Sequence, residues 1–289
     1  MAKKYRKSNR KRSKRAKTDM RTILVTAIIL AGAWVVNSLI GCDNPEDVQI
    51  VRNEGAYGNL MKVVTNPAVP SQLKSYKGMD ISFNEKCHIP NWVSWELTDE
   101  ETMGDVPRKD KFTSDPDIEG CPDSWDYSYS GYDRGHMAPA GDMKWDSKAM
   151  EETFFMSNIC PQVNALNTGA WKNLEEKCRL WAQIDGRIYI VCGPIIDEKP
   201  MELIGDSRVW VPSRFFKAII APYSNPARGI GFIMPNEKVK GGMQPCAVTI
   251  DEIERITGHD LFPALPDDIE AELESQCNFN QWSTLKKKN

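Results

Sequence analysis

The segment GYDRGHMAPAGD, residues 131–142, places an arginine and a histidine two positions apart among Gly, Asp and Pro. His136, one of three histidines in the chain, suits a general base, because a free imidazole with a pKa of about 6.5 is largely neutral near pH 7. Arg134 offers a rigid fork of N–H donors that fits a phosphate. The segment could also be a polar surface loop, so residues elsewhere must decide.

Three further segments carry side chains that could complete a site for phosphodiester cleavage. Such a site needs a base to activate water, a cation at the phosphate oxygens, and hard oxygen ligands where Mg²⁺ takes part. The candidates are Arg108 in RKDKFTSD, Asn158 and Asn167 in SNICPQVNALNTGAW, and Glu175 in WKNLEE.

Asn167 and Glu175 are eight residues apart, which is about 2.2 helical turns, so they face roughly the same side of a helix. In one continuous helix they would lie about 12 Å apart along the axis, too far to bind one ion directly. We therefore expect Asn167 to precede or open the helix. Asn167 could then bind a metal ion while Glu175 reaches a water in the metal's shell.

These motifs together resemble the DNA/RNA non-specific endonucleases, the ββα-metal nucleases that include mitochondrial endonuclease G. The resemblance rests on D-R-G-H followed by S-N-I-x-P-Q, L-N-x-G-A-W and L-E, and it extends over about 200 residues, from YKGMDISFN to ITGHDLFPALPDDIE. It implies an α+β fold of the ββα-metal (His-Me finger) type. The central sheet would be mostly antiparallel and flanked by helices.

The resemblance also implies a role for each matching residue. His136 would be the general base, Asn167 the direct Mg²⁺ ligand, and Glu175 would hold the metal through water. Arg134, and Arg108 in the looser R-x-x-x-F-x-x-D match, would contact the phosphate.

Asn158 would help to shape the site. The implied activity is Mg²⁺-dependent, sequence-non-specific hydrolysis of DNA and RNA to 5′-phosphate products, with a metal-bound water protonating the leaving 3′ oxygen. Mn²⁺ could substitute for Mg²⁺.

Structural alternatives exist for several of these residues. Arg134 could form an ion pair with Asp133, which we expect to orient the turn, and Asn167 could cap the helix that follows it. His88 is expected to be structural. His259 follows a glycine at an expected helix end, where a cation favours the helix dipole, so we predict a capping role for it.

Hydrophobic patterns predict the elements around these motifs. Alternation in NWVSWELT predicts a strand over residues 92–97, residues 98–131 should be mostly loop, and TFFMSNI predicts a strand over residues 153–159. A helix with a buried stripe follows, and its stripe consists of Trp171, Leu174, Cys178 and Trp181.

RIYIVC, RVWVP, FFKAII and RGIGFIMP predict strands whose short, turn-rich connections favour antiparallel pairing. TIDEIERITG predicts a helix with a capping box from Thr249 to Glu252 and a stop at Gly258. A last helix should begin near Pro266.

The N-terminal segment differs sharply from the rest of the chain. Residues 1–42 hold 11 Lys and Arg and one acid, and the apolar stretch at residues 23–36 leads to LIGC, which resembles a bacterial lipobox ending at Cys42. The basic run could bind nucleic acid, but its position before an apolar stretch favours an export signal. An uncleaved membrane anchor is the main alternative. We therefore expect an exported, membrane-tethered protein.

The expected organisation is an export segment at 1–42, a linker at 43–69, one nuclease domain at 70–280 and a basic tail at 281–289. Seven cysteines follow Cys42; their odd number leaves at least one unpaired within a chain, and no spacing indicates a zinc module. Their disulfide pairing and the oligomeric state stay open.

Residues 43–289 carry a net charge of −13, which should repel a polyanion. We therefore expect weak, salt-sensitive binding through a local cluster of Arg108, Arg134, Lys144 and Lys172. Two other functions remain open, namely a phosphodiesterase for small or lipid phosphates and a non-catalytic surface lipoprotein that keeps the nuclease scaffold as a binding module.

Overall fold

The computed structural model describes residues 57–284, and their largest element is a seven-stranded sheet. The sheet has the order β1-β2-β3-β6-β9-β10-β11, and all its neighbouring strands are antiparallel. Its strands are β1 (Gln72–Ser75), β2 (Asp80–Asn84), β3 (Ile89–Thr98), β6 (Arg187–Ile195), β9 (Arg214–Ala221), β10 (Arg228–Pro235) and β11 (Ala247–Val248). The predicted antiparallel α+β architecture is confirmed.

Two small two-stranded sheets lie outside this sheet. They are formed by β4 (Asp133–His136) with β5 (Ile159–Gln162), and by β7 (Glu202–Ile204) with β8 (Val209–Val211). The helices are α2 (Asp99–Thr102), α3 (Ser147–Glu152), α4 (Lys172–Asp185), α5 (Ile250–Thr257), α6 (Asp267–Glu274) and α7 (Phe279–Ser283). Short 3₁₀ turns lie at η1 (Ser124–Tyr127), η2 (Met156–Asn158) and η4 (Gln244–Cys246), and a π-helical segment at η3 (Leu166–Trp171).

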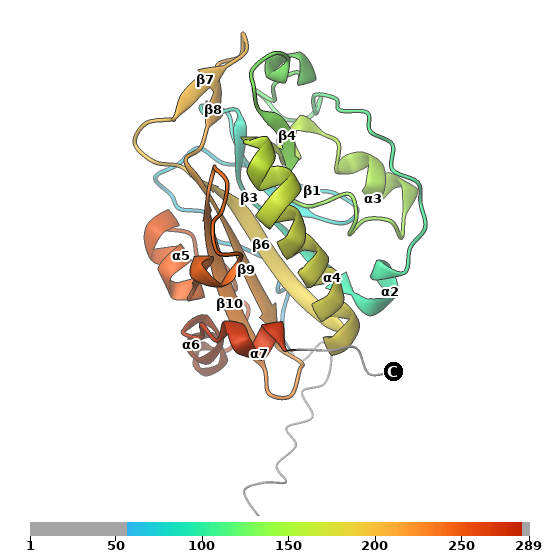
Figure 1. The fold of residues 1–289 in the computed structure, drawn as a ribbon, viewed down its shortest axis with the longest axis vertical. Helices are drawn as coiled ribbons and strands as arrows, with labels where there is room; N and C mark the ends of the chain where they lie inside the picture. Colours follow the sequence, from blue (N-terminus) through green and yellow to red (C-terminus); the bar gives the residue numbers. More distant parts are fainter. Residues whose placement is uncertain (1–56, 285–289) are drawn as a thin grey trace, which may run out of the picture. The chain divides into compact units, whose positions relative to one another are not determined.

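The sheet separates two hydrophobic cores. Helix α4 crosses one face, and α5 and α6 pack beside β10 with the other core (Figure 1). Neighbouring residues of a central strand serve opposite faces: Phe215 belongs to the α4 core and Phe216 to the α5–α6 core. Because β6 and β9 are buried on both faces, they appear in the sequence as continuous apolar runs.

Helix α4 has the buried stripe that its sequence predicts. Leu174, Cys178 and Trp181 are buried on its sheet-facing side, together with Trp171 just before it. These residues are therefore core residues, as expected.

The predicted strand over residues 153–159 is wrong for most of its length. The Thr153 N–H donates to the Ala149 carbonyl at the end of α3, residues 156–158 form a 3₁₀ turn, and the strand begins only at Ile159. Apolar residues alone do not distinguish a buried helix end from a buried strand.

Helix α5 ends at Gly258 in the left-handed conformation, as predicted, but the expected cationic cap does not follow. The side chain of His259 is buried, its Nδ1 accepts a hydrogen bond from the Asn66 N–H, and burial lowers its pKa to about 4. His259 is thus neutral at pH 7, and the capping prediction for it is wrong. At the start of the helix, the Thr249 hydroxyl accepts from the Glu252 N–H.

The folded unit extends beyond the predicted boundaries of 70 and 280. Leu60 and Val63 are buried, Val64 pairs with Asp260, and Trp282 packs against Trp181 near the C-terminal end.

Among the described residues, 57–284, no helix is both long enough and apolar enough to cross a bilayer. The predicted export segment and Cys42 lie outside them. The seven later cysteines are all unpaired in this structure.

Candidate active site

One cavity of about 350 Å³ brings together five side chains that are far apart in the sequence. They are Arg108, Arg134, His136, Asn167 and Glu175. All five were predicted as site residues, so the sequence-based grouping corresponds to one place in the fold.

The antiparallel pair of strands β4 and β5 positions the arginine and the histidine. Residues two apart on a strand face the same side, so Arg134 and His136 both reach the cavity. The residue between them must be glycine, because a Cβ on Gly135 would lie 2.2 Å from the Gln162 Oε1 on the paired strand. This packing explains the D-R-G-H pattern.

His136 is 8% exposed and packs against two phenylalanine rings that also contact each other. The ring centroids of Phe112 and Phe154 are 5.4 and 5.0 Å from its own. Burial, with a smaller contribution from the Arg108 charge, lowers the pKa of His136 to about 3. The imidazole is therefore neutral at pH 7, which is the form that accepts a proton.

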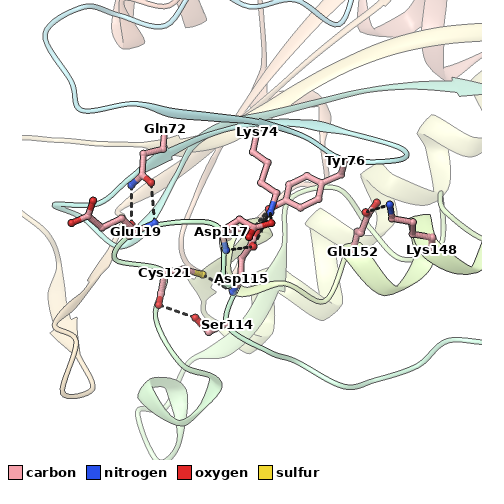
Figure 2. A network of polar contacts seen from close by, with 11 residues as sticks. Gln72, Lys74, Tyr76, Ser114, Asp115, Asp117, Glu119, Cys121, Lys148 and Glu152 are labelled. Carbon is pink, nitrogen blue, oxygen red and sulfur yellow. Dashed lines mark hydrogen bonds and ion pairs between the residues drawn. The ribbon is translucent and has the colours of Figure 1, made fainter.

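The loop that carries Arg108 is tied to the sheet through a buried carboxylate (Figure 2). Asp115 accepts hydrogen bonds from Lys74 Nζ at 2.8 Å and from the Tyr76 hydroxyl. Phe112 of the same loop packs on His136, and the Arg108 guanidinium lies 5.1 Å from the Phe154 ring centroid. The R-x-x-x-F-x-x-D pattern thus supplies a cation, a ring against the histidine and an anchor.

The guanidinium of Arg134 does not form an ion pair with Asp133, its neighbour in the sequence. Its Nη2 donates to the Ser124 carbonyl at 2.6 Å, whereas Asp133 Oδ2 accepts from Asn167 Nδ2 at 2.8 Å. The alternative of an Arg134–Asp133 ion pair is therefore wrong. Because Asp133 holds the amide nitrogen of Asn167, the amide oxygen is left available for a cation.

Asn167 opens the helix through a π-helical turn. The turn includes Gly169, whose φ of −105° and ψ of −111° interrupt the helix between Asn167 and Glu175. The N-cap residues are Ala165 for this turn and Trp171 for α4, so the alternative that Asn167 caps the helix is wrong. Because the π-helical segment separates them, Asn167 and Glu175 do not lie in one continuous helix, and the axial separation of about 12 Å expected for such a helix does not apply.

Glu175 lies in the first turn of α4 and is half-buried. Burial raises the pKa of its carboxyl to about 7, although the nearby Lys217 charge acts in the opposite direction. A carboxylate and a free amide oxygen are hard ligands, so Asn167 and Glu175 suit a hydrated Mg²⁺.

Asn158 does not line the cavity but shapes the chain next to it. Its side chain is buried, accepts from the Ala138 N–H and donates to the carbonyls of Ala138 and Thr153, each at 2.9 Å. It holds the backbone that follows His136 and is a positioning residue.

Comparison with known proteins agrees with this geometry. Residues 56–268 match the family model described as DNA/RNA non-specific endonuclease. The chain belongs to this family.

Relatives span most of the folded unit. The chain is 34% identical to the human mitochondrial nuclease EXOG over 251 residues, covering 75% of this chain and 68% of EXOG. It is 36% identical to the mitochondrial nuclease of Saccharomyces cerevisiae, covering 64% of this chain and 63% of the yeast protein. A chain in the crystal structure of the EndoG/EndoGI complex superimposes with a TM-score of 0.63 at 29% identity, covering 68% of this chain and 89% of that one. The predicted nuclease class is confirmed, and the non-catalytic alternative is not supported.

Two basic residues at the site of this nuclease were not predicted from its sequence. Arg179 lines the cavity and donates to Asp142 at 2.8 Å. Its position four residues after Glu175 on α4 could have indicated it, because i and i+4 share a helix face. Lys217 lies beneath the cavity in β9, fully buried, with Nζ 4.9 Å from the Trp95 ring centroid and 4.5 Å from that of Trp171. Nothing in FFKAII distinguishes it from a surface lysine.

Most of the charged side chains that line the cavity are basic. Arg108, Arg134, Lys172 and Arg179 line it together with one carboxylate, that of Glu175. Three of these cations also pair with carboxylates outside the lining: Arg108 with Asp110, Lys172 with Glu176 and Arg179 with Asp142. Lys144, which was predicted to join this cluster, lies instead in a neighbouring depression that also contains Arg179. Three of the four predicted cluster members therefore share the cavity.

Proposed function

We propose that this nuclease is a Mg²⁺-dependent endonuclease that hydrolyses DNA and RNA with little base specificity and leaves 5′-phosphates. The observation that carries the proposal is the cavity in which a neutral His136 meets the oxygen donors of Asn167 and Glu175. The cations around it supply phosphate contacts.

Different residues of the chain bind the phosphate and accept the proton. Arg134 and Arg108 bind the non-bridging oxygens of the phosphate and orient it toward His136. The neutral imidazole accepts a proton from the attacking water, and Asp133 keeps the Asn167 amide in the orientation that presents its oxygen.

Asn167 and Glu175 would hold the metal ion, which when bound supplies positive charge to the phosphate and the leaving oxygen. Mn²⁺ accepts the same oxygen donors and would substitute.

Low base specificity follows from the kind of side chains present. Phosphate contacts position a nucleic acid without reading its sequence, and four cations dominate the cavity. The cavity is therefore suited to the backbone that DNA and RNA share.

A comparison of substrates tests this proposal against hydrolysis of small or lipid phosphates. The purified full-length chain is incubated with plasmid DNA, with RNA and with a small chromogenic phosphodiester, each in Mg²⁺, Mn²⁺ or EDTA. We expect cutting of both nucleic acids with either metal and none in EDTA. Turnover of the small diester without cutting of nucleic acid would overturn the proposal.

We also propose that the nuclease is exported and tethered to a membrane through residues 1–42. The support is the basic run, the apolar stretch and the LIGC sequence before Cys42. Cell fractionation of the wild type and of Cys42→Ser tests it. If Cys42 carries lipid, the variant should be released from the membrane or accumulate as its precursor. If residues 1–42 are an uncleaved anchor, the variant should behave like the wild type. A soluble cytoplasmic wild type would contradict export.

A further inference from the structure

Three carboxylates converge between α5 and α6, on the sheet face opposite α4. One oxygen each of Asp251, Glu254 and Glu274 lies within 4.8 Å of the others. The two helices lie together beside β10 (Figure 1). None of these acids belongs to the active-site cavity.

Glu274 distinguishes this group from an ordinary acidic surface. The residue is only 5% exposed, and its Oε1 is buried with no hydrogen-bond partner within residues 57–284. Leaving a buried carboxylate oxygen unsatisfied costs free energy, so such a group is normally paired with a donor or a metal ion.

The other two members are arranged to complete a ligand set. Glu254 uses Oε1 to accept from the Leu261 N–H at 2.7 Å, which fixes the side chain and leaves Oε2 available. Asp251 is exposed, so the group opens to solvent on its side and leaves room for water ligands.

The surroundings of the group disfavour its charged form. Burial raises the pKa of Glu274 to about 9 and that of Glu254 to about 7. The neighbouring carboxylates act on Glu274 in the same direction. A bound cation would stabilise the charged form of these side chains.

We infer that Asp251, Glu254 and Glu274 form a second metal site, separate from the catalytic one, that takes Ca²⁺ and joins α5 to α6. All donors are carboxylate oxygens, which hard cations prefer. Ca²⁺ binds six to eight oxygens at about 2.3–2.6 Å and tolerates irregular geometry. Mg²⁺ demands near-ideal octahedral geometry and usually keeps several waters, so a group of three carboxylates suits Ca²⁺ better.

Ca²⁺ binding to the full-length chain tests the second metal site once Asn167, the ligand of the catalytic metal, has been replaced. In an Asn167→Ala background we expect about one Ca²⁺ per chain by isothermal titration calorimetry in 150 mM NaCl. We also expect 1 mM Ca²⁺ to raise the melting temperature by about 3 °C or more. Adding Glu274→Gln should abolish both effects, whereas adding Glu272→Gln, an exposed acid on the same helix, should preserve them.

Glu274→Gln is expected to fold, because glutamine has the shape of the protonated acid. Asp251→Asn, at an exposed position, provides a second variant and should weaken Ca²⁺ binding at least tenfold. The inference is overturned if N167A binds no Ca²⁺, or if N167A/E274Q and N167A/D251N bind it as tightly as N167A. Nuclease activity of E274Q with Mg²⁺ is measured separately, so failure of this site is distinguishable from failure of the proposed nuclease function.

Discussion

At the scale of single residues, the cavity shifts the pKa values of a base and an acid in opposite directions. Burial is the main cause of both shifts: it lowers the pKa of His136 to about 3 and raises the pKa of Glu175 to about 7. At neutral pH the histidine is ready to accept a proton, while the carboxyl is near the middle of its titration. The metal site, and not the imidazole, should then limit activity on the acidic side.

Metal affinity should therefore depend on pH through Glu175. The carboxyl is protonated below its pKa and charged above it, so protons compete with Mg²⁺ as the pH falls through 7. We expect Mg²⁺ affinity to fall about tenfold between pH 8 and pH 6, as a single titrating group with this pKa requires. Calorimetry on the wild type and Glu175→Gln checks this. Equal pH dependence in the two proteins would contradict it.

Gly135 should not tolerate a methyl group. In Gly135→Ala the new Cβ would meet Gln162 Oε1 at 2.2 Å, which should destabilise the protein by about 1–3 kcal/mol and lower cleavage activity by displacing β4. Thermal unfolding and plasmid cleavage measure the two effects. Adding Gln162→Ala removes the clash and should recover part of both losses; no recovery would show that the contact is not the cause.

Site residues with a distinctive motif could be predicted from the sequence, and residues that act through packing could not. His136, Arg134, Asn167 and Glu175 lie in recognisable patterns and share one cavity. Lys217 reaches the site from a central strand, and its burial becomes visible only in three dimensions.

At the scale of elements, the β4–β5 strand pair and a π-helical turn bring the histidine and the asparagine to one cavity. Antiparallel pairing and the buried stripe of α4 follow hydrophobic periodicity, so the sequence was sufficient to predict them. The Met156 N–H at the 3₁₀ turn donates to the Thr113 carbonyl, far away in the sequence, and His259 is neutral because the fold buries it. No local pattern encodes either feature.

Lys217 on β9 should support the metal site from beneath. Its charge lowers the pKa of Glu175, so Lys217→Met should favour the protonated carboxyl and weaken Mg²⁺ binding near pH 7, by about fivefold for each unit that the pKa rises. The fold should survive, because a hydrophobic residue of similar volume often replaces a buried charge at little cost. Calorimetry and thermal unfolding measure both properties, with exposed Lys199→Met as the control. Unchanged affinity in K217M would contradict this role.

At the scale of the whole molecule, charge is distributed unevenly. Residues 43–289 are strongly acidic, yet the cavity has four cations against one carboxylate. Long-range repulsion is screened at physiological salt, whereas contacts inside the cavity act at short range. The acidic surface is thus compatible with a nucleic-acid substrate.

Binding should consequently weaken steeply with salt. If about three phosphates are neutralised in the cavity, affinity for duplex DNA should fall about 100-fold between 50 and 300 mM NaCl. Arg134→Gln should lower both the affinity and the slope. Fluorescence anisotropy with a labelled duplex in EDTA measures both, and a flat profile for the wild type would contradict phosphate-dominated binding.

His136 and a metal held by Asn167 and Glu175 are expected to act on the same phosphodiester bond. Single-turnover plasmid cleavage by the wild type, His136→Ala and His88→Ala, each with Mg²⁺ or EDTA, measures whether both are required. We expect the wild type and H88A to cut only with Mg²⁺, and H136A to lose about 10²–10⁴-fold in rate while still binding DNA. Cleavage by H136A at the wild-type rate, or undiminished cutting in EDTA, would contradict this expectation.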